Sequence, residues 1–161
     1  MEGKKGGLIV RYKLCPPLPA TCSLRGLHSI SKILIMLAKT YRKPLVVGNW
    51  KMNKTVSEAV ELTRALLLEL GQQLQVAVVL CPPFTALEAV GRLLENKSPQ
   101  LAAQNFYPAA SGAFTGEISA EMLRELYCTH VIVGHSERRL QLGETESFIQ
   151  SKVKGALSYN L

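Results

Sequence analysis

Four short apolar runs alternate with amphipathic stretches from Leu45 to the end of the sequence. The runs span residues 45–49, 76–80, 101–104 and 131–134. None of them alternates apolar with polar positions, and continuous runs of this length are typical of strands that are buried on both faces. The pattern therefore predicts four strands of a parallel sheet.

A capping box predicts the start of the first helix. Thr55 stands three residues before Glu58, so each side chain can bond the backbone N–H of the other residue. Gly71 is the stop signal at the far end of this helix. The apolar residues expected to share its buried side are Val60, Leu67 and Leu70.

Two further helices are predicted in the same way. Thr85 and Glu88 repeat the capping-box spacing for a second helix that runs through Leu94. Ser119 is the expected N-cap of a third helix that extends to about Leu126. Both helices fall between apolar runs, as connections between parallel strands require.

A fourth helix is predicted over residues 145–157, after the last apolar run. Its expected buried residues are Phe148, Ile149, Val153 and Ala156. Strand and helix thus alternate four times, which indicates parallel strands joined by right-handed crossovers. The pattern by itself fits either an open doubly wound sheet or half of a closed barrel.

The first 43 residues form a basic extension with no clear period. Nine lysines and arginines face a single acid, Glu2, for a net charge of +8, whereas the whole chain carries +7. From Pro44 onward ten basic residues face eleven glutamates, for a net charge of −1. We expect residues 1–43 to be disordered and residues 44–161 to fold. Because the folded part is nearly neutral, we expect no nucleic-acid partner.

Two interpretations of the extension remain open. An acid-poor, basic, hydroxyl-containing leader fits an organellar transit peptide. Alternatively, the start site is over-extended, since Met36 precedes the first strand by nine residues. We expect a cytoplasmic protein, with organellar targeting possible under the first interpretation. No run reaches the roughly 18 apolar residues that suggest a membrane span, so we expect no membrane partner.

The cysteines predict neither a disulfide framework nor a metal site. Cys15, Cys22, Cys81 and Cys128 include no C-x-x-C pair, and no histidine stands at a ligand-like interval from them. Cys81 and Cys128 adjoin predicted strands, where buried thiols acting as small apolar groups are expected. This usage is typical of a reducing compartment.

Polar side chains follow the first and fourth predicted strands, where chemistry lies in parallel α/β folds. Asn49 and Lys51 supply an amide and a cation that suit an anionic substrate. The alternative is that Lys51 is an ordinary loop lysine that only contacts solvent. His135 ends the fourth strand just before a short helix that begins at Ser136. A helix N-terminus favours the neutral imidazole, which can still donate an N–H to a developing oxyanion. A hydrogen-bonded histidine without a role is the alternative.

Three long motifs resemble those of triosephosphate isomerase. They are GNWKMN at 48–53, GAFTGEIS at 112–119 and GHSERR at 134–139. They occur in the family's order, and CPPFT at 81–85 agrees with them. The resemblance implies a (β/α)8 TIM barrel, of which residues 44–161 supply the first four βα units. It also implies interconversion of dihydroxyacetone phosphate and D-glyceraldehyde 3-phosphate through an enediolate.

The resemblance carries roles for four residues of the expected site. Asn49 and Lys51 match the substrate-contacting pair, and Lys51 faces the negative charge of the substrate. His135 matches the electrophile that polarises the carbonyl, a neutral histidine already established for this family. Glu137 matches a glutamate close to the active site.

Other implied features concern assembly. Thr115 matches the residue that enters the partner subunit of a homodimer, and Glu117 and Arg138 match inter-subunit or loop-bracing contacts. The substrate is a small triose phosphate. No cofactor or metal is implied, because a proton that moves between adjacent carbons requires neither.

The resemblance covers only half of a barrel, which typically has ~250 residues. The family's catalytic base is a glutamate after the sixth strand, and no residue of this sequence matches it. We therefore expect the chain alone to be inactive, and marginally folded or self-associating. Three hypotheses follow: an isomerase whose recorded sequence is incomplete, a short non-enzymatic structural or interaction module, and an enzyme assembled with a separate C-terminal half.

Overall fold

A computed structural model describes residues 43–71 and 75–161. The strands are β1 (Leu45–Asn49), β2 (Ala77–Cys81), β3 (Gln100–Ala103) and β4 (His130–Val131). The α-helices are α2 (Val56–Leu70), α3 (Leu87–Leu94), α4 (Ala120–Glu125), α5 (Ser136–Gln141) and α6 (Glu146–Ser158), with a 3-10 turn η1 (Phe84–Ala86). The predictions of disorder and targeting concern residues 1–43, and all of these except Lys43 lie outside the described part.

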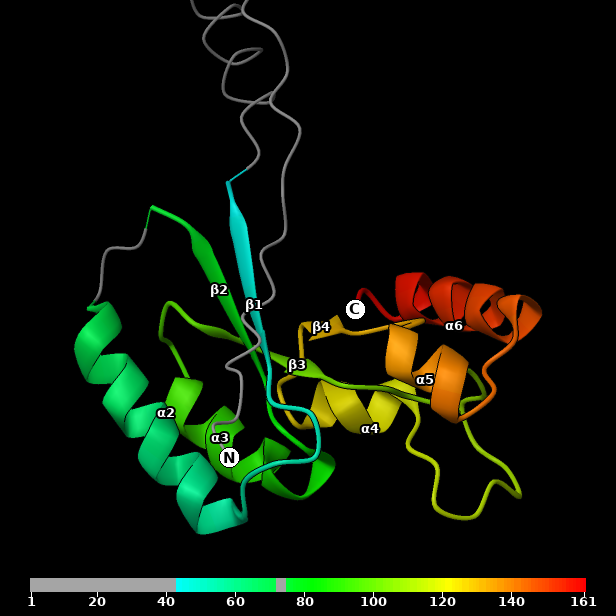
Figure 1. Cartoon of the computed structure of the whole chain (residues 1–161), viewed down its shortest axis with the longest axis horizontal. Coiled ribbons are helices and arrows are strands. Elements are labelled where there is room, and N and C mark those ends of the chain that lie inside the picture. The colour runs from blue at the N-terminus through cyan, green and yellow to red at the C-terminus, as the bar shows by residue number, and fades with distance from the viewer. Residues whose placement is uncertain (1–42, 72–74) are drawn as a thin grey trace, which may run out of the picture. The chain divides into compact units, whose positions relative to one another are not determined.

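The four strands form one parallel sheet in the order β1-β2-β3-β4 (Figure 1). Leu45 is opposite Ala77, Val79 opposite Gln100 and Ala102 opposite His130. A doubly wound sheet reverses its strand order at a switch point, whereas a barrel adds each strand beside the last. The unbroken order therefore confirms the first four units of a barrel and decides the choice that the sequence pattern left open.

Alternate residues of β2 and β3 are buried on opposite faces of the sheet. One face joins the main core, with Val78, Leu80 and Leu101 packed among residues of α2, α3, α4 and α6. The other face holds a smaller cluster around Val79 and Ala102. Burial on both faces is thus confirmed for β2 and β3.

The same expectation is wrong for β1. Val46 is 54% exposed and Val47 is 41% exposed. These residues stand opposite Val78 and Val79, so they belong to the two different faces of the sheet. β1 lies at the end of the strand order and has a neighbouring strand on one side only. Other residues therefore cover Val46 and Val47 less completely than they cover Val78 and Val79 of β2.

The prediction for β4 was too long. The strand comprises only His130 and Val131, although Ile132 N–H still donates to Ala103 O at 2.9 Å. The chain then turns through Gly134, which has a φ of +65°. A backbone in the left-handed region cannot continue a strand, so the predicted run 131–134 ends early.

Three helices begin where the sequence predicted, and a capping residue stands at each start. The capping box of Thr55 and Glu58 is present at α2, which ends at Gly71. The hydroxyl of Ser119 accepts from Met122 N–H at α4. Thr145 caps α6 in the same way.

The capping box predicted at Thr85 is absent. The 3-10 turn begins at Phe84, directly after its N-cap Pro83, so Thr85 lies inside that turn rather than at a cap. Helix α3 starts two residues later without a side-chain cap, and Glu88 pairs with Arg92 at 2.6 Å instead. Because the turn begins one residue before Thr85, Thr85 is not in the N-cap position that the capping-box spacing requires.

The buried face of α6 also differs from the prediction. Ile149 and Ala156 are buried as expected, whereas Phe148 is half-buried and Val153 is 45% exposed. Lys152 is buried instead, with 1% of its surface exposed. A charged side chain thus occupies the central position of a helix face that the pattern assigned to apolar residues.

Gly91 lets α3 approach the end of α4 closely. A Cβ atom there would lie 3.0 Å from Leu126 O and 3.2 Å from Leu101 Cδ2. We expect Gly91→Ala to lower the free energy of unfolding by about 1–3 kcal/mol, because this added methyl group overpacks the core. Urea unfolding followed by the fluorescence of Trp50 measures the change; Trp50 is the chain's only tryptophan.

Gly155→Ala is the matched control for that substitution. A Cβ atom at Gly155 lies in ordinary contact with Phe106, at 3.4 Å. Because alanine is the better helix former, Gly155→Ala should instead raise the free energy of unfolding by about 0.5–1 kcal/mol. Equal effects of the two substitutions would contradict the close-packing argument for Gly91.

Candidate active site

Polar side chains from several strand ends meet at one pocket of about 510 Å³. Its lining includes Asn49 and Lys51 after β1, Gln104 after β3, and His135 and Glu137 after β4. The sheet order places these carboxyl-terminal ends at one edge, although Lys51 and Glu137 are 86 residues apart. The four residues predicted for the site therefore lie together.

Lys51 forms an ion pair with Glu137. Its Nζ donates to Glu137 Oε1 at 2.5 Å, and both side chains remain partly exposed. The hydrogen bond from Lys51 holds the pKa of Glu137 below its ordinary value of 4.5, with attraction from the same ammonium adding to the effect. The carboxylate therefore stays ionised at neutral pH and keeps the lysine at the pocket.

Lys51 also has an unusual backbone conformation, with a φ of +54°. Its N–H donates to Asn49 Oδ1 at 3.0 Å. The side-chain Nε2 of Gln104 donates to Lys51 O at 2.8 Å and to Cys81 O at 2.9 Å. Sequence reasoning placed Gln104 in the third strand and missed this contact, although an amide that ends an apolar run was a usable signal.

His135 caps helix α5, as the expected helix start at Ser136 implies. Its Nδ1 accepts from Glu137 N–H at 3.3 Å. A ring nitrogen that accepts carries a lone pair, so in the neutral imidazole the proton is on Nε2. His135 can therefore present an N–H donor from Nε2.

A buried polar cluster adjoins the pocket, and sequence reasoning missed it. Glu144 Oε1 accepts from Arg138 Nε at 2.6 Å and from Lys152 Nζ. Lys152 Nζ also donates to Asn105 Oδ1 at 2.6 Å and lies 4.7 Å from the ring centroid of Phe148. Because Asn105 and Arg138 line the pocket, this cluster connects its wall to α6.

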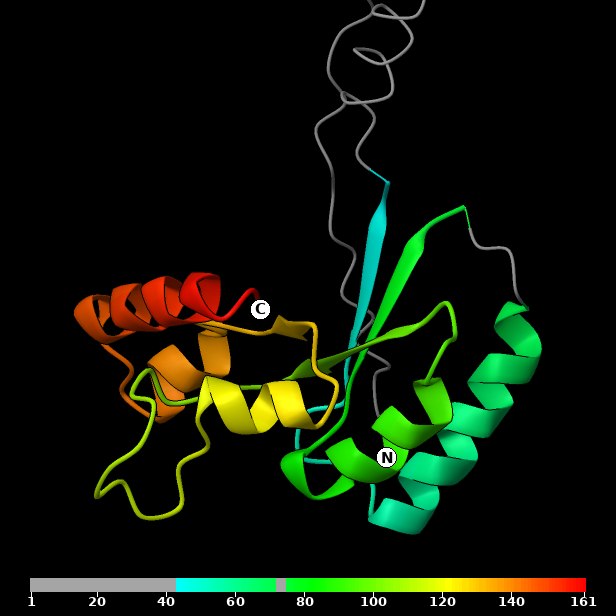
Figure 2. The same ribbon diagram turned by 180° about the vertical axis from the view of Figure 1, so that it is seen from behind.

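The loop that carries Thr115 and Glu117 does not line this pocket. Residues 110–117 are exposed, and Figure 2 shows the yellow-green loop extending away from the neighbouring helices. Phe114 packs against Tyr107 with ring centroids 4.2 Å apart. Thr115 and Glu117 are therefore available to a surface contact rather than to the pocket, whereas Arg138 is engaged by Glu144.

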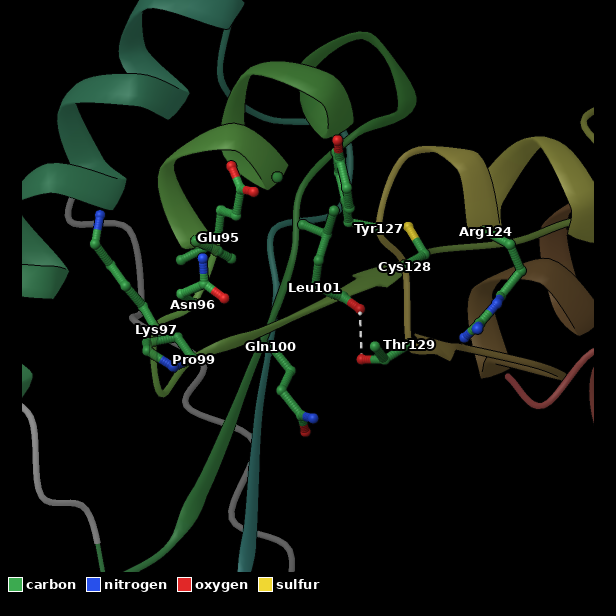
Figure 3. Close-up of a pocket in the computed structure, with 12 residues that line it drawn as sticks. Glu95, Asn96, Lys97, Pro99, Gln100, Leu101, Arg124, Tyr127, Cys128 and Thr129 are labelled. Carbon is green, nitrogen blue, oxygen red and sulfur yellow. Dashed lines mark hydrogen bonds between the residues drawn. The ribbon is translucent and has the colours of Figure 1, made fainter.

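Another cavity, of about 460 Å³, lies at the amino-terminal end of β3 (Figure 3). Its labelled polar side chains point in different directions, Gln100 and Lys97 among them. Lys97 Nζ donates to Leu93 O, and Thr129 Oγ1 donates to Leu101 O. Because its polar groups diverge and two of them are already bonded, we do not place a site there.

The two cysteines of the described ranges are free, and both are buried as the sequence predicted. Burial raises the pKa of Cys81 and of Cys128 to about 12, so neither thiol is a reactive thiolate. Within residues 43–71 and 75–161, no three His, Cys or Glu side chains gather closely enough to hold a metal ion. No helix in these ranges has the length and apolar character needed to cross a bilayer.

Comparisons with known proteins agree with the motifs. The family model of triosephosphate isomerase matches residues 44–161. The chain is 51% identical over 120 residues to triosephosphate isomerase of Chloroflexus aurantiacus and 52% identical to that of a Roseiflexus species. Each match covers 74% of this chain and 48% or 47% of the relative.

A solved structure shows the same relationship in three dimensions. The crystal structure of triosephosphate isomerase from Bartonella henselae has a TM-score of 0.69 and 35% sequence identity. The match covers 74% of this chain and 49% of the other. The chain thus spans about half the length of the curated relatives it matches. It belongs to the triosephosphate isomerase family.

Proposed function

We propose that this chain carries half of the active site of a triosephosphate isomerase, which interconverts dihydroxyacetone phosphate and D-glyceraldehyde 3-phosphate. The meeting of Lys51, His135, Glu137 and Asn49 at one pocket supports this proposal most directly. A cation beside an N–H donor suits a substrate that is an anion and develops an oxyanion.

Each side chain has a distinct role in the proposed reaction. Asn49 and Lys51 bind the substrate, and the ammonium of Lys51 offsets its negative charge. His135 donates from Nε2 to the carbonyl oxygen as the enediolate forms, which lowers the energy of that charge. Glu137 holds Lys51 in place and supplies the N–H that orients His135. The base that removes the carbon-bound proton is a glutamate of the other half of the barrel.

The proposal extends to assembly and location. The exposed loop around Thr115 inserts into a second subunit of a homodimer, and Glu117 and Arg138 contribute to bracing that loop. Because the relatives are bacterial proteins and the described cysteines are free, we place the reaction in the cytoplasm.

A second candidate function is a non-enzymatic half-barrel that serves as an interaction module. The exposed valines of β1 favour this second function, because exposed apolar surface at the edge of a sheet is a site where another chain can bind. The intact mass of the endogenous protein separates the two: 17.7 kDa favours the module. A mass of about 27 kDa, the size of a whole barrel, favours the isomerase.

A completed barrel tests the proposed activity. Residues 1–161 are joined to the half of the Chloroflexus aurantiacus relative that this chain does not match, and isomerase turnover is measured. We expect turnover from the completed barrel and none above background from the 161-residue chain alone. Turnover that survives Lys51→Ala in the completed barrel would contradict the proposed site.

A further inference from the structure

We infer that Gln104 is a positioning residue that holds Lys51 in its left-handed conformation and so directs the ammonium into the pocket. This inference rests on the proposed function of Lys51. It concerns the side chain that secures the catalytic lysine's backbone, rather than any group that touches the substrate.

The backbone of Lys51 needs such support. Its φ of +54° lies in a region that a side chain with a Cβ atom disfavours, and lysine has no special tolerance for it. A residue persists there when surrounding contacts over-determine it. Relaxation to a negative φ would turn the Cα–Cβ bond and swing the amine away from Glu137.

Amide side chains bond both polar groups of this residue's backbone. Asn49 Oδ1 accepts the N–H of Lys51, and Gln104 donates to its carbonyl oxygen. Asn49 is only two residues away, at the end of β1, so its bond joins Lys51 only to the strand that precedes it. Gln104 is 53 residues away on the end of β3, so its bond ties the loop to the neighbouring part of the sheet.

The second bond of Gln104 gives this tie a fixed anchor. Nε2 also donates to Cys81 O, the last carbonyl of β2, which accepts from Trp50 N–H at 3.0 Å as well. Both neighbours of this atom are carbonyl oxygens, which only accept hydrogen bonds. The atom must therefore be the NH2 nitrogen of the Gln104 amide and not its oxygen, so the amide has one orientation. One side chain thereby connects the ends of β1, β2 and β3 at Lys51.

The test compares Gln104→Met with Gln100→Met in the completed barrel. Methionine keeps the length of glutamine but donates no hydrogen bond. We expect Gln104→Met to lower kcat/KM by about 10²-fold, the effect of a misplaced catalytic group. Gln100 is exposed at the opposite end of the same strand, so Gln100→Met should change kcat/KM by less than about twofold.

A double-substitution cycle separates positioning from general destabilisation. In the Lys51→Ala background no ammonium remains to be placed, so adding Gln104→Met should cost less than about twofold in kcat/KM. An equal loss in both backgrounds would overturn the inference. So would full activity of Gln104→Met in a barrel that Lys51→Ala inactivates.

Backbone NMR of Lys51 decides the inference independently of turnover. The three-bond coupling between its amide proton and its α-proton, together with the distance between these two protons, reports the sign of φ. We expect the left-handed values in the completed barrel and their loss in Gln104→Met. Unchanged values would overturn the inference, even where the unmodified barrel shows no turnover and the proposed function itself has failed.

Discussion

Lys152→Met should lower the free energy of unfolding of the completed barrel by about 3–5 kcal/mol, the cost of removing one partner of a buried ion pair. Lys152 is 1% exposed and Glu144 is 4% exposed, so water cannot replace the lost contact. Methionine fills a similar volume but leaves Asn105 Oδ1 without the donor it has now. The substitution also removes one of the two cations that contact Glu144 Oε1. Glu144 Oε2 has no hydrogen bond that could compensate for this loss.

Lys154→Met is the matched control, because Lys154 is exposed two residues further along the same helix. Its effect on the free energy of unfolding should stay within about 0.5 kcal/mol. Urea unfolding of both variants, followed by far-ultraviolet circular dichroism, gives the comparison. Similar losses for the two lysines would mean that the buried cluster adds no stability.

The pH dependence of stability provides a second check on the same cluster. Burial by itself raises the pKa of Glu144, but hydrogen bonds from Lys152 and Arg138 outweigh it and hold that pKa below its ordinary value of 4.5. A lowered folded pKa gives stability that is complete above the unfolded value and is lost as the pH falls. Unfolding free energy should therefore fall below pH 4.5, and less steeply in Lys152→Met. If the unfolding free energy fell equally steeply with pH in both proteins, Lys152 would not be the cause of the lowered pKa of Glu144.

His135→Gln should lower kcat of the completed barrel by about 10²–10³-fold with a smaller change in KM, as the loss of one oxyanion donor does. Nδ1 of His135 is occupied by Glu137 N–H, which leaves Nε2 as the donor. A glutamine amide is shorter than the ring and cannot place an N–H at the same point. Because the donor meets charge that grows in the transition state, kcat changes more than KM.

His130→Gln is the control for this prediction. His130 begins β4 at the opposite end of the strand, and its Nδ1 bonds Thr129 Oγ1 at 2.9 Å. Steady-state rates in both directions should therefore stay close to those of the unmodified barrel. A comparable fall in kcat for both histidines would indicate a folding defect rather than a lost electrophile.

The sequence by itself determined the helix starts at Thr55, Ser119 and Thr145, and most of the strand positions. In each case the capping contact joins a side-chain oxygen to a backbone N–H group only three residues away, so the neighbouring residues contain all that the contact needs. The motifs at the strand ends likewise predicted that Lys51 and His135 lie near each other, and both line the same pocket, because parallel strands place their carboxyl ends at one edge of the sheet.

Only the tertiary structure decided the contacts between distant residues. Gln104 reaches Lys51 across 53 positions, and Lys152 reaches Asn105 across 47, so no local spacing announces either pair. The exposure of Val46 depends on which strands flank β1, whereas its apolar side chain predicts burial. Hydrophobic periodicity reports what a side chain prefers, but burial and long-range hydrogen bonds depend on which segments the fold brings together.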